Sequence, residues 1–420
     1  MKTQRWLERY DRWFSVTEIY QSQVLKAALG AVLFIYFVTF LFWAGETRFT
    51  VEAVQNSTHI CWPYFTNCGA WYWFSGLPYG YSQQFWYMVL FALIAGSAWA
   101  MIIGHWRWAH ALMWPLFLWK LLWVLVLSMA QVGNYEYYHL VFSAVLLLCP
   151  HKEFFLKFSV VWFYFLSTAA KIHPSWTLGT YFSSLKTGLP LFPDNTIPIW
   201  TNLVVIMEMV AAWWLLSPRG WLQRAVLIFF VIFHLYSGLL VSYRYPATVL
   251  PMLFILFGPW YQTTKIPSGL STVPGWILIG LLGLAQSISH FIPGDEKLTM
   301  EGNFYGLYMF EANHQCRSDI TVHYHNREAE TFEKEVFKAR DRCDSYRIWF
   351  RYNQLCQSKA DIKAVSVKFD HSINGAPFYR IIDEPNICAL KYHPFKRNDW
   401  IKTPDTGAQK VGYPMYNYYY

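Results

Sequence analysis

The stretch VWFYFLSTAAKIHPSW, residues 161–176, shows which kind of fold the chain adopts. It is an apolar and aromatic run that ends at Lys171. Such a run is typical of a helix in hydrocarbon, and an ammonium at the end of a membrane span is costly enough to mark a candidate functional group. The stretch therefore predicts a membrane helix with a candidate functional lysine at its end.

The composition of the 420-residue chain agrees with a membrane protein. Hydrophobic residues make up 55% of the chain, aromatic residues 20% and charged residues only 14%, which is far from the usage of soluble domains. About nine segments are apolar enough to span a bilayer. They lie near residues 27–44, 86–104, 109–130, 137–150, 156–171, 198–216, 225–242, 247–262 and 274–292. The sequence predicts a polytopic α-helical membrane protein, and its first span is expected to be retained because no small-residue cleavage pattern follows it.

Basic residues set the expected orientation. The N-terminal segment carries Lys2, Arg5, Arg9 and Arg12, and further lysines and arginines fall in alternate loops. With nine spans these residues share one side, which the positive-inside rule makes cytoplasmic. The formal charge of +8 is explained in this way, so no nucleic-acid partner is expected. The N-terminus is predicted to be cytoplasmic and the C-terminal domain periplasmic, extracellular or ER-luminal.

A change of composition near residue 293 divides the chain. We expect a transmembrane helical bundle over residues 1–293, and a small extracytoplasmic α+β domain with an aromatic tail over residues 294–420. Alternating residues predict strands in ITVHYH, residues 320–325, and IKAVSVKF, residues 362–369. Between them a mixed helical segment is expected near residues 328–353.

The cysteines support the expected orientation. Of the 7 cysteines, Cys149 alone falls at the end of a predicted span, and the others lie on the extracytoplasmic side. An even set on an oxidising face indicates disulfides, although the sequence leaves the pairing open. No spacing typical of metal ligands occurs, so no metal is expected. Asn56, in Asn56-Ser57-Thr58, fits a glycosylation acceptor.

Few ionisable residues lie inside or at the outer ends of the spans. They are His110, Lys120, Glu136, His139, Lys171, His173, Glu208, His234 and His290. A histidine in such a setting more often makes a hydrogen bond between helices than takes part in catalysis. Lys120, in FLWKLLW, could pair with Glu208, snorkel or contact an aromatic ring. Lys171 differs, because burial without a partner penalises its ammonium and favours a neutral amine that can act as a base, with snorkelling as the alternative.

Several segments, taken in order, point to one family. VWFYFLSTAAKIHPSWTLG holds Lys171 five residues before Trp176, and the segments IMEMVAAWWLLSP and IFHLYSGLLVSYRYP follow, the second with Phe233-His234. EGNFYGLYMFEANHQCRSDITVHY, HSINGAPFYRIIDE and HPFKRNDWI come after the last span. Together they resemble the vitamin K-dependent gamma-glutamyl carboxylases of the horizontally transferred transmembrane (HTTM) family, over roughly residues 25 to 402.

The resemblance implies a reaction. Lys171 would deprotonate reduced vitamin K or menaquinol, O2 would add to the anion, and the alkoxide formed would take the γ-proton of a glutamate that CO2 then carboxylates. The partner would be an exported protein or peptide with glutamate residues, and the chemistry needs a dry pocket because water would quench the alkoxide. The substrate or quinone pocket implied by the family consists of Asn134, Tyr135, Trp176, His234, His314 and Arg317.

The resemblance also implies a disulfide between Cys61 in ICWPYF and Cys356 in RYNQLCQS. Two positions depart from the family. Tyr135 stands where the carboxylases have a histidine, and Ser237 stands where they have an asparagine. A tyrosine donates a hydrogen bond but does not take up a proton at neutral pH. Recognition of a propeptide is not expected, because the long C-terminal portion of the animal enzymes has no counterpart here.

Two classes of function follow. The first is an integral membrane enzyme that couples oxygenation of a reduced quinone to carboxylation of glutamate, or, in a narrower form, oxygenates the quinol without carboxylation or uses the alkoxide on another substrate. The second is a non-enzymatic membrane maturation or assembly factor that holds a secreted partner, with Lys171 paired structurally to a carboxylate. A shared fold does not decide between them.

Overall fold

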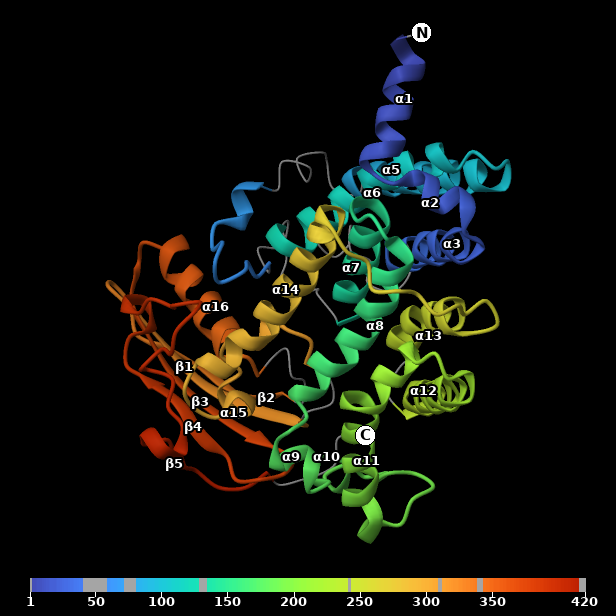
Figure 1. Ribbon diagram of the computed structural model, residues 1–420. Coiled ribbons are helices and arrows are strands. Elements are labelled where there is room, and N and C mark those ends of the chain that lie inside the picture. Colours follow the sequence, from blue (N-terminus) through green and yellow to red (C-terminus); the bar gives the residue numbers. More distant parts are fainter. Residues whose placement is uncertain are drawn as a thin grey trace. The chain divides into compact units, whose positions relative to one another are not determined.

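The fold consists mainly of helices, with one antiparallel sheet near the C-terminus (Figure 1). The computed structural model describes residues 2–40, 59–71, 81–127, 134–240, 243–308, 312–337 and 343–414. The chain forms two compact units. The first comprises Met1–Phe165 and Met207–Leu282, and the second comprises Leu166–Ile206 and Gly283–Tyr420. These units divide the chain at points other than residue 293, and the predicted domain boundary stays a prediction.

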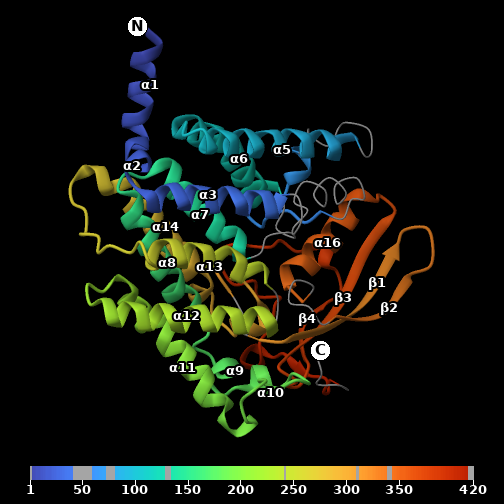
Figure 2. The ribbon, with the colours of Figure 1, turned by 90° about the vertical axis from the view of Figure 1, so that its right-hand side faces the viewer.

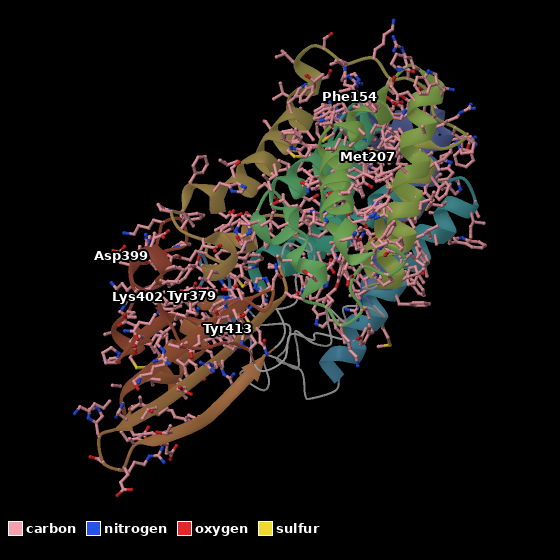
Figure 3. All side chains as sticks on the ribbon, turned by 90° about the horizontal axis from the view of Figure 1, so that it is seen from below. Phe154, Met207, Tyr379, Asp399, Lys402 and Tyr413 are labelled. Carbon is pink, nitrogen blue, oxygen red and sulfur yellow. A yellow bond between two sulfur atoms is a disulfide. The ribbon has the colours of Figure 1, made fainter. Side chains whose placement is uncertain are left out.

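The first unit is helical. Its helices are α1 (Lys2–Trp13), α2 (Val16–Gln21), α3 (Gln23–Val38), α5 (Tyr81–Ile102), α6 (Trp106–Leu122), α7 (Asn134–Leu148), most of α8 (Lys152–Ala169), α12 (Gly220–Leu240), α13 (Arg244–Phe257) and most of α14 (Val273–Ser287). Side chains fill the space between the helices, as Figure 3 shows around Phe154 and Met207. Where α3 and α7 meet, the buried Tyr36 hydroxyl donates to Ser143 Oγ at 2.9 Å, a contact typical of helices packed in a membrane.

Within the described residues, five helices are long and apolar enough to cross a bilayer. They are Phe85–Ile102, Trp106–Val126, Asp194–Leu216, Gly220–Leu240 and Leu270–Phe291. Shorter apolar helices occupy Gln23–Val38, Tyr135–Leu148 and Arg244–Phe257, and α8 overlaps the remaining predicted segment. The outer face of α5 exposes Met88, Phe91 and Trp99, as expected where a helix meets lipid. A membrane protein is thus supported, while nine crossings stay a prediction.

The second unit contains the sheet and several short helices. These elements are α9 (Pro174–Thr177), α10 (Thr180–Ser183), most of α11 (Ile197–Met209), α15 (Glu296–Thr299), β1 (His314–Tyr324), β2 (Glu330–Phe337), α16 (Ser345–Ser358), β3 (Ile362–Ile373), β4 (Tyr379–Glu384) and β5 (Gln409–Lys410). The strand order is β2-β1-β3-β4-β5, and all described pairs are antiparallel (Figure 2). Alternate side chains of β1 and β3, such as Val322, Val365 and Val367, are fully buried, which is the pattern of a sheet with one covered face.

The strands predicted at residues 320–325 and 362–369 are confirmed as parts of β1 and β3. The helical prediction for residues 328–353 is wrong in its first half, where β2 forms. Strand β2 pairs with the free edge of β1, and this pairing outweighs the weak local helix preference of its charged sequence. A helix begins only at α16, where the Asp344 carboxylate accepts a hydrogen bond from Tyr346 N at 2.9 Å and so caps the first turn.

All 7 cysteines lie within the described residues, and six form disulfides. The pairs are Cys61–Cys68, Cys316–Cys343 and Cys356–Cys388, and Cys149 is a buried free thiol. The pairing of Cys61 with Cys356 implied by the family is therefore wrong. Cys61 and Cys356 each bond to a different cysteine that lies close by. The Cα atoms of Cys61 and Cys68 are 5.4 Å apart and those of Cys356 and Cys388 are 5.8 Å apart, distances that suit a disulfide. The candidate glycosylation site at Asn56 lies outside the described residues.

Candidate functional site around Lys171

The candidate site begins where α8 ends. The chain turns twice, since Lys171 N donates to Thr168 O at 2.8 Å and His173 N donates to Lys171 O at 2.8 Å. His173 then caps α9, because its Nδ1 accepts a hydrogen bond from Ser175 N at 3.1 Å. These two turns bring Lys171 and Trp176, five residues apart, onto the same side of the chain.

Lys171 is buried against the ring of Trp176. Its side chain is 1% exposed, and Nζ lies 5.2 Å from the centroid of the Trp176 ring. Trp176 is itself buried, and its Nε1 donates to Thr201 O at 3.0 Å. Tyr181 and Phe182 pack on Trp176 with ring centroids 5.6 Å away. The ring is thus fixed, and it offers its negative face to the lysine.

Two asparagines of the sheet hold the segment that follows Lys171. Asn374 Nδ2 donates to Ser175 O at 3.2 Å and to Thr180 Oγ1 at 3.0 Å. Asn313 Nδ2 donates to Tyr181 O at 2.6 Å, and Asn313 N donates to Asn374 Oδ1 at 2.8 Å. Helices α9 and α10 are therefore fastened to the sheet at the start of β1 and the end of β3.

The position of Asn374 follows from a tight turn. Asn374 and Gly375 both have positive φ, 53° and 72°, in the connection between β3 and β4. Two successive residues with positive φ are typical of the Asn-Gly turns that join antiparallel strands. In the sequence, the Asn-Gly pair between two strand-like runs is the signal that locates this turn.

A pair of histidines lies beside these asparagines. His314 begins β1 and His371 lies on β3, one diagonal step away, because the register pairs Cys316 with His371. His314 Nδ1 is 3.1 Å from His371 Nε2, and His371 Nδ1 is 2.5 Å from Leu298 O. A carbonyl oxygen can only accept, so His371 carries its proton on Nδ1 and, when neutral, accepts at Nε2 from His314. Burial lowers the pKa of His371 to about 4, which favours this neutral form. The sequence reading missed His371.

Helix α15 carries charged groups next to this pair. Asp295 Oδ1 caps the helix by accepting from Lys297 N at 2.9 Å, and it lies 3.8 Å from His173 Nε2. Burial lowers the pKa of His173, although the Asp295 charge raises it. Burial raises the pKa of Glu296, but the hydrogen bond from His290 and the charge of Lys297 lower it further, to about 2. Glu296 is therefore ionised, between His290 and Lys297.

Arg317, a predicted substrate residue, lies in an ion network that joins three strands. Its Nε donates to Asp370 Oδ2 at 2.8 Å, and Arg380 Nε donates to Asp370 Oδ1 at 2.8 Å. The Arg317 guanidinium also lies 4.5 Å from the ring centroid of Phe378. Asp370 is 1% exposed, and such a buried carboxylate needs charged partners. Arg317 thus has a structural task on the sheet, and its role toward a substrate stays a prediction.

Three other predicted pocket residues, Asn134, Tyr135 and His234, belong to the first unit. Asn134 is the first residue of α7, and Tyr135 follows it with a partly exposed side chain. His234 Nε2 lies 2.5 Å from the hydroxyl of Tyr164, and both side chains are buried. The ring of Tyr245 is 5.4 Å from that of His234. The structure therefore surrounds His234 with phenols, and the roles of these residues stay predictions.

Lys120 lies in a polar cluster of the first unit. Its ammonium forms an ion pair with Glu136, and both side chains are 0% exposed. It also donates to Thr39 Oγ1 at 3.3 Å and lies 5.1 Å from the ring centroid of Phe40. The aromatic contact considered for Lys120 is therefore present, the carboxylate partner shown is Glu136, and its full burial excludes snorkelling.

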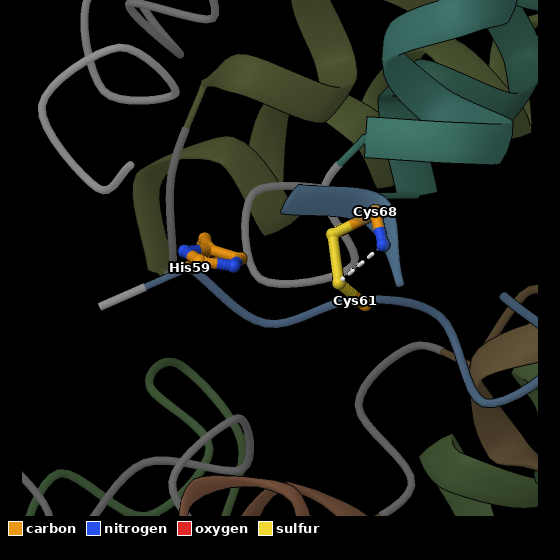
Figure 4. A group of neighbouring side chains, drawn as sticks. All are labelled: His59, Cys61 and Cys68. Atoms are coloured by element: carbon orange, nitrogen blue, oxygen red, sulfur yellow. Dashed lines mark hydrogen bonds between the residues drawn. A yellow bond between two sulfur atoms is a disulfide. The ribbon is translucent and has the colours of Figure 1, made fainter. Parts of the chain in front are cut away.

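One group of potential metal ligands occurs in the described chain. His59, Cys61 and Cys68 lie together in the segment between α3 and α5 (Figure 4). Cys68 N also donates to Cys61 Sγ at 3.0 Å. The two sulfur atoms form a disulfide, so neither is the thiolate that binds a metal. Of this group, the imidazole of His59 alone remains as a potential metal ligand.

No protein-family model matches the chain, and comparisons with curated proteins and with solved structures also find no match. The fold itself defines a mainly helical protein with helices that could span a membrane, an antiparallel sheet in a unit with two disulfides, and a buried lysine at the end of an apolar helix. The resemblance to the carboxylases rests on the sequence segments quoted above.

Proposed function

We propose that the chain is an integral membrane enzyme of the vitamin K-dependent gamma-glutamyl carboxylase type, with Lys171 as its base. It couples oxygenation of reduced vitamin K or menaquinol to carboxylation of glutamate in an exported protein or peptide, with O2 and CO2 as co-substrates. The observation that carries the proposal is the burial of Lys171, 1% exposed, against Trp176 at 5.2 Å.

Burial and the indole ring suit Lys171 to accept a proton. The buried Lys171 amine would take the proton of a quinol hydroxyl as a general base. Once the ammonium forms, the face of Trp176 stabilises it. The hydrogen bond from Trp176 to Thr201 O, 3.0 Å long, keeps the ring in place. Lys171 can therefore hold the proton while charge develops on the substrate.

The surroundings of Trp176 suit a flat, apolar ligand. Tyr181 and Phe182 pack against Trp176 with their ring planes tilted by 44° and 60° from its plane. The neighbourhood of Lys171 is therefore rich in aromatic side chains, against which an aromatic ligand packs favourably. A reduced naphthoquinone supplies, when bound, the electrons that reduce oxygen. The buried aromatic residues exclude water, which would otherwise quench a strong base.

A direct assay tests the proposal. Purified protein is given vitamin K hydroquinone and oxygen, and the epoxide and the incorporation of labelled CO2 into a glutamate peptide are measured separately. Lys171→Met removes the amine but keeps an unbranched apolar side chain, and it should lower epoxide formation by about 10²–10⁴-fold without a change in the unfolding midpoint. The matched control is Lys186→Met, which removes an exposed lysine of the same unit and should keep full activity.

The two products separate the forms of the proposal. Epoxide together with carboxylated peptide supports the whole reaction. Epoxide alone supports the narrower quinol oxygenase, in line with Tyr135 in place of the family's histidine. Folded wild-type protein that forms no epoxide from any of several reduced naphthoquinones refutes the enzyme and leaves the membrane assembly factor.

We further propose that the N-terminus is cytoplasmic and that the sheet lies on the extracytoplasmic side. The disulfides Cys316–Cys343 and Cys356–Cys388 in the sheet-bearing unit support this orientation, because disulfides persist in oxidising compartments. In sealed vesicles of known orientation, a membrane-impermeant protease should cleave the sheet only from the extracytoplasmic face. Cleavage only from the cytoplasmic face reverses the assignment.

A further inference from the structure

We propose that α1 (Lys2–Trp13) lies flat in the headgroup layer of the membrane and binds anionic lipids there. The proposal does not depend on the enzyme activity proposed above. It rests on three observations within the first unit: where α1 is attached, how it runs, and which side chains it leaves exposed.

Helix α1 is attached to the end of a helix that could cross the bilayer. Arg107 Nε donates to Asp11 Oδ1 at 2.8 Å, and the two side chains form an ion pair. The hydroxyl of Tyr10 lies 2.7 Å from His110 Nδ1. Arg107 and His110 belong to the first two turns of the candidate span Trp106–Val126. These contacts place the C-terminal half of α1 at the depth where that span would enter the membrane.

Helix α1 also runs across the direction of two candidate spans, α5 and α6. In Figures 1 and 2, α1 stands at a steep angle to α5 and α6, and its N-terminal part projects past them. If α6 crosses the bilayer, a helix in this position runs along the bilayer surface. The projecting part then lies over lipid rather than over protein, which is the position of an interfacial helix.

The exposed side chains of α1 fit that position. Trp6 and Trp13 are 59% and 66% exposed, and because they are seven residues apart they lie on the same side of the helix. Arg9 is exposed beside them, about 60° from Trp6, and Arg12 is exposed about 120° from Trp6, at the border of that side. Glu8, also exposed, follows Trp6 by two residues and lies on the other side at about 100° per residue.

This arrangement selects lipid as the partner. Tryptophan rings prefer the boundary between headgroups and acyl chains, and arginines next to them reach lipid phosphates. Arg9, next to the tryptophans, matches the negative charge of an anionic leaflet, and the long side chain of Arg12 can reach the same phosphates from the border of that face. Glu8 points toward water. A water-facing helix would instead leave two large aromatic side chains uncovered at the membrane surface.

Spin labels on the full-length protein test the proposal. A nitroxide is attached to Trp6→Cys and, in a matched protein, to Glu8→Cys, in bilayers of phosphatidylcholine with phosphatidylglycerol. The native cysteines are in disulfides or, for Cys149, buried, so the new thiol is labelled selectively. The label at position 6 should collide more often with oxygen, which concentrates in the bilayer, than with a water-soluble nickel complex. The label at position 8 should collide more often with the nickel complex. Equal exposure of both labels to the nickel complex overturns the proposal, as does a Trp6 label shielded from both reagents by protein.

A second variant tests the lipid class. Each arginine near an anionic surface contributes roughly fivefold to binding, so Arg9→Gln with Arg12→Gln should lower the ratio of docked to undocked α1 by roughly 25-fold in bilayers with phosphatidylglycerol. In pure phosphatidylcholine the double variant and the wild type should behave alike. If the Trp6 label reports the same depth in both lipids, for wild type and variant, the binding of anionic lipid is refuted.

Discussion

The side-chain amide of Asn374 donates a hydrogen bond to Ser175 O, 3.2 Å away, across a sequence separation of 199 residues. This bond joins the turn between β3 and β4 to the short helix that follows Lys171. The order of the chain around Lys171 and Trp176 therefore depends on the sheet, although the lysine itself ends an apolar helix. Contacts of this kind link the stability of the second unit to its candidate chemistry.

Replacement of Asn374 should reveal this dependence. Asn374→Ala removes the amide and places an alanine at a φ of 53°, so we expect a loss of about 2–3 kcal/mol of unfolding free energy from the lost hydrogen bonds and the left-handed backbone. Asn374→Gly loses the hydrogen bonds but tolerates the backbone, so it should be milder. Thermal unfolding in detergent measures both. Equal midpoints for the two variants and the wild type would show that the amide does not fasten the segment.

The stability of the second unit should depend on pH through Glu301. This buried carboxylate accepts hydrogen bonds from Asn398 N and Nδ2 at 2.8 and 2.9 Å. Burial raises the pKa of Glu301 from 4.5 to about 7, although the bonds from Asn398 lower it. Between these two pH values the folded protein binds more protons than the unfolded chain, so its stability falls as pH rises through that range.

Glu301→Gln should remove this pH dependence. The amide still accepts from Asn398 but does not titrate, so the variant should be more stable than the wild type above pH 7 by at most about 3 kcal/mol. Unfolding midpoints are compared at several pH values. Asp405→Asn, which removes an exposed carboxylate, serves as the control. An unchanged slope in Glu301→Gln contradicts the assignment.

Lys120 and Glu136 should behave as a coupled pair. Both side chains are fully buried, so Lys120→Met leaves Glu136 without this cation and should cost about 3–5 kcal/mol. Addition of Glu136→Gln removes the uncompensated charge and should recover most of that loss. The coupling is measured by a double-mutant cycle of unfolding free energies. Additive effects of the two single substitutions would mean that the ion pair does not form.

The disulfide pattern can be read by peptide mapping. Digestion of the unreduced protein should release linked peptides that contain Cys61–Cys68, Cys316–Cys343 and Cys356–Cys388, and reduction should separate them. The two disulfides of the second unit, Cys316–Cys343 and Cys356–Cys388, close loops of 27 and 32 residues, and Cys61–Cys68 closes a loop of 7. Removal of either of the two longer-loop disulfides should therefore cost roughly 1 kcal/mol more than removal of Cys61–Cys68. A peptide linking Cys61 to Cys356 would contradict the structure.

The parts that the sequence predicts well are those decided by local pattern. The apolar runs coincide with helices because about 20 apolar residues have few other stable forms in a membrane chain. Lys171 and Trp176 come together because only two short turns separate them. Strands β1 and β3 were recognised because their side chains alternate between buried and exposed faces.

The parts that escaped prediction depend on contacts between distant residues. His371 contacts His314 only because the register pairs β1 with β3, and no periodicity within HSING indicates that register. Strand β2 has the composition of a solvated helix, and the edge of β1 decides its conformation. The partner of Cys61 could have been chosen by nearness in sequence, yet the family pattern pointed to a distant cysteine.

The two imidazoles of His314 and His371 have one further consequence. Leu298 O fixes the proton of His371 on Nδ1. With both rings neutral, His314 Nδ1 therefore donates to His371 Nε2, and His371 Nδ1 donates to Leu298 O. The pair then behaves as a single oriented dipole, whose electron-rich end is Nε2 of His314. To reverse this polarity, both rings would have to change tautomer, and Leu298 O would lose its hydrogen-bond donor. The carbonyl of Leu298 therefore keeps Nε2 of His314, the first residue of β1, as a hydrogen-bond acceptor, although His371 lies between them.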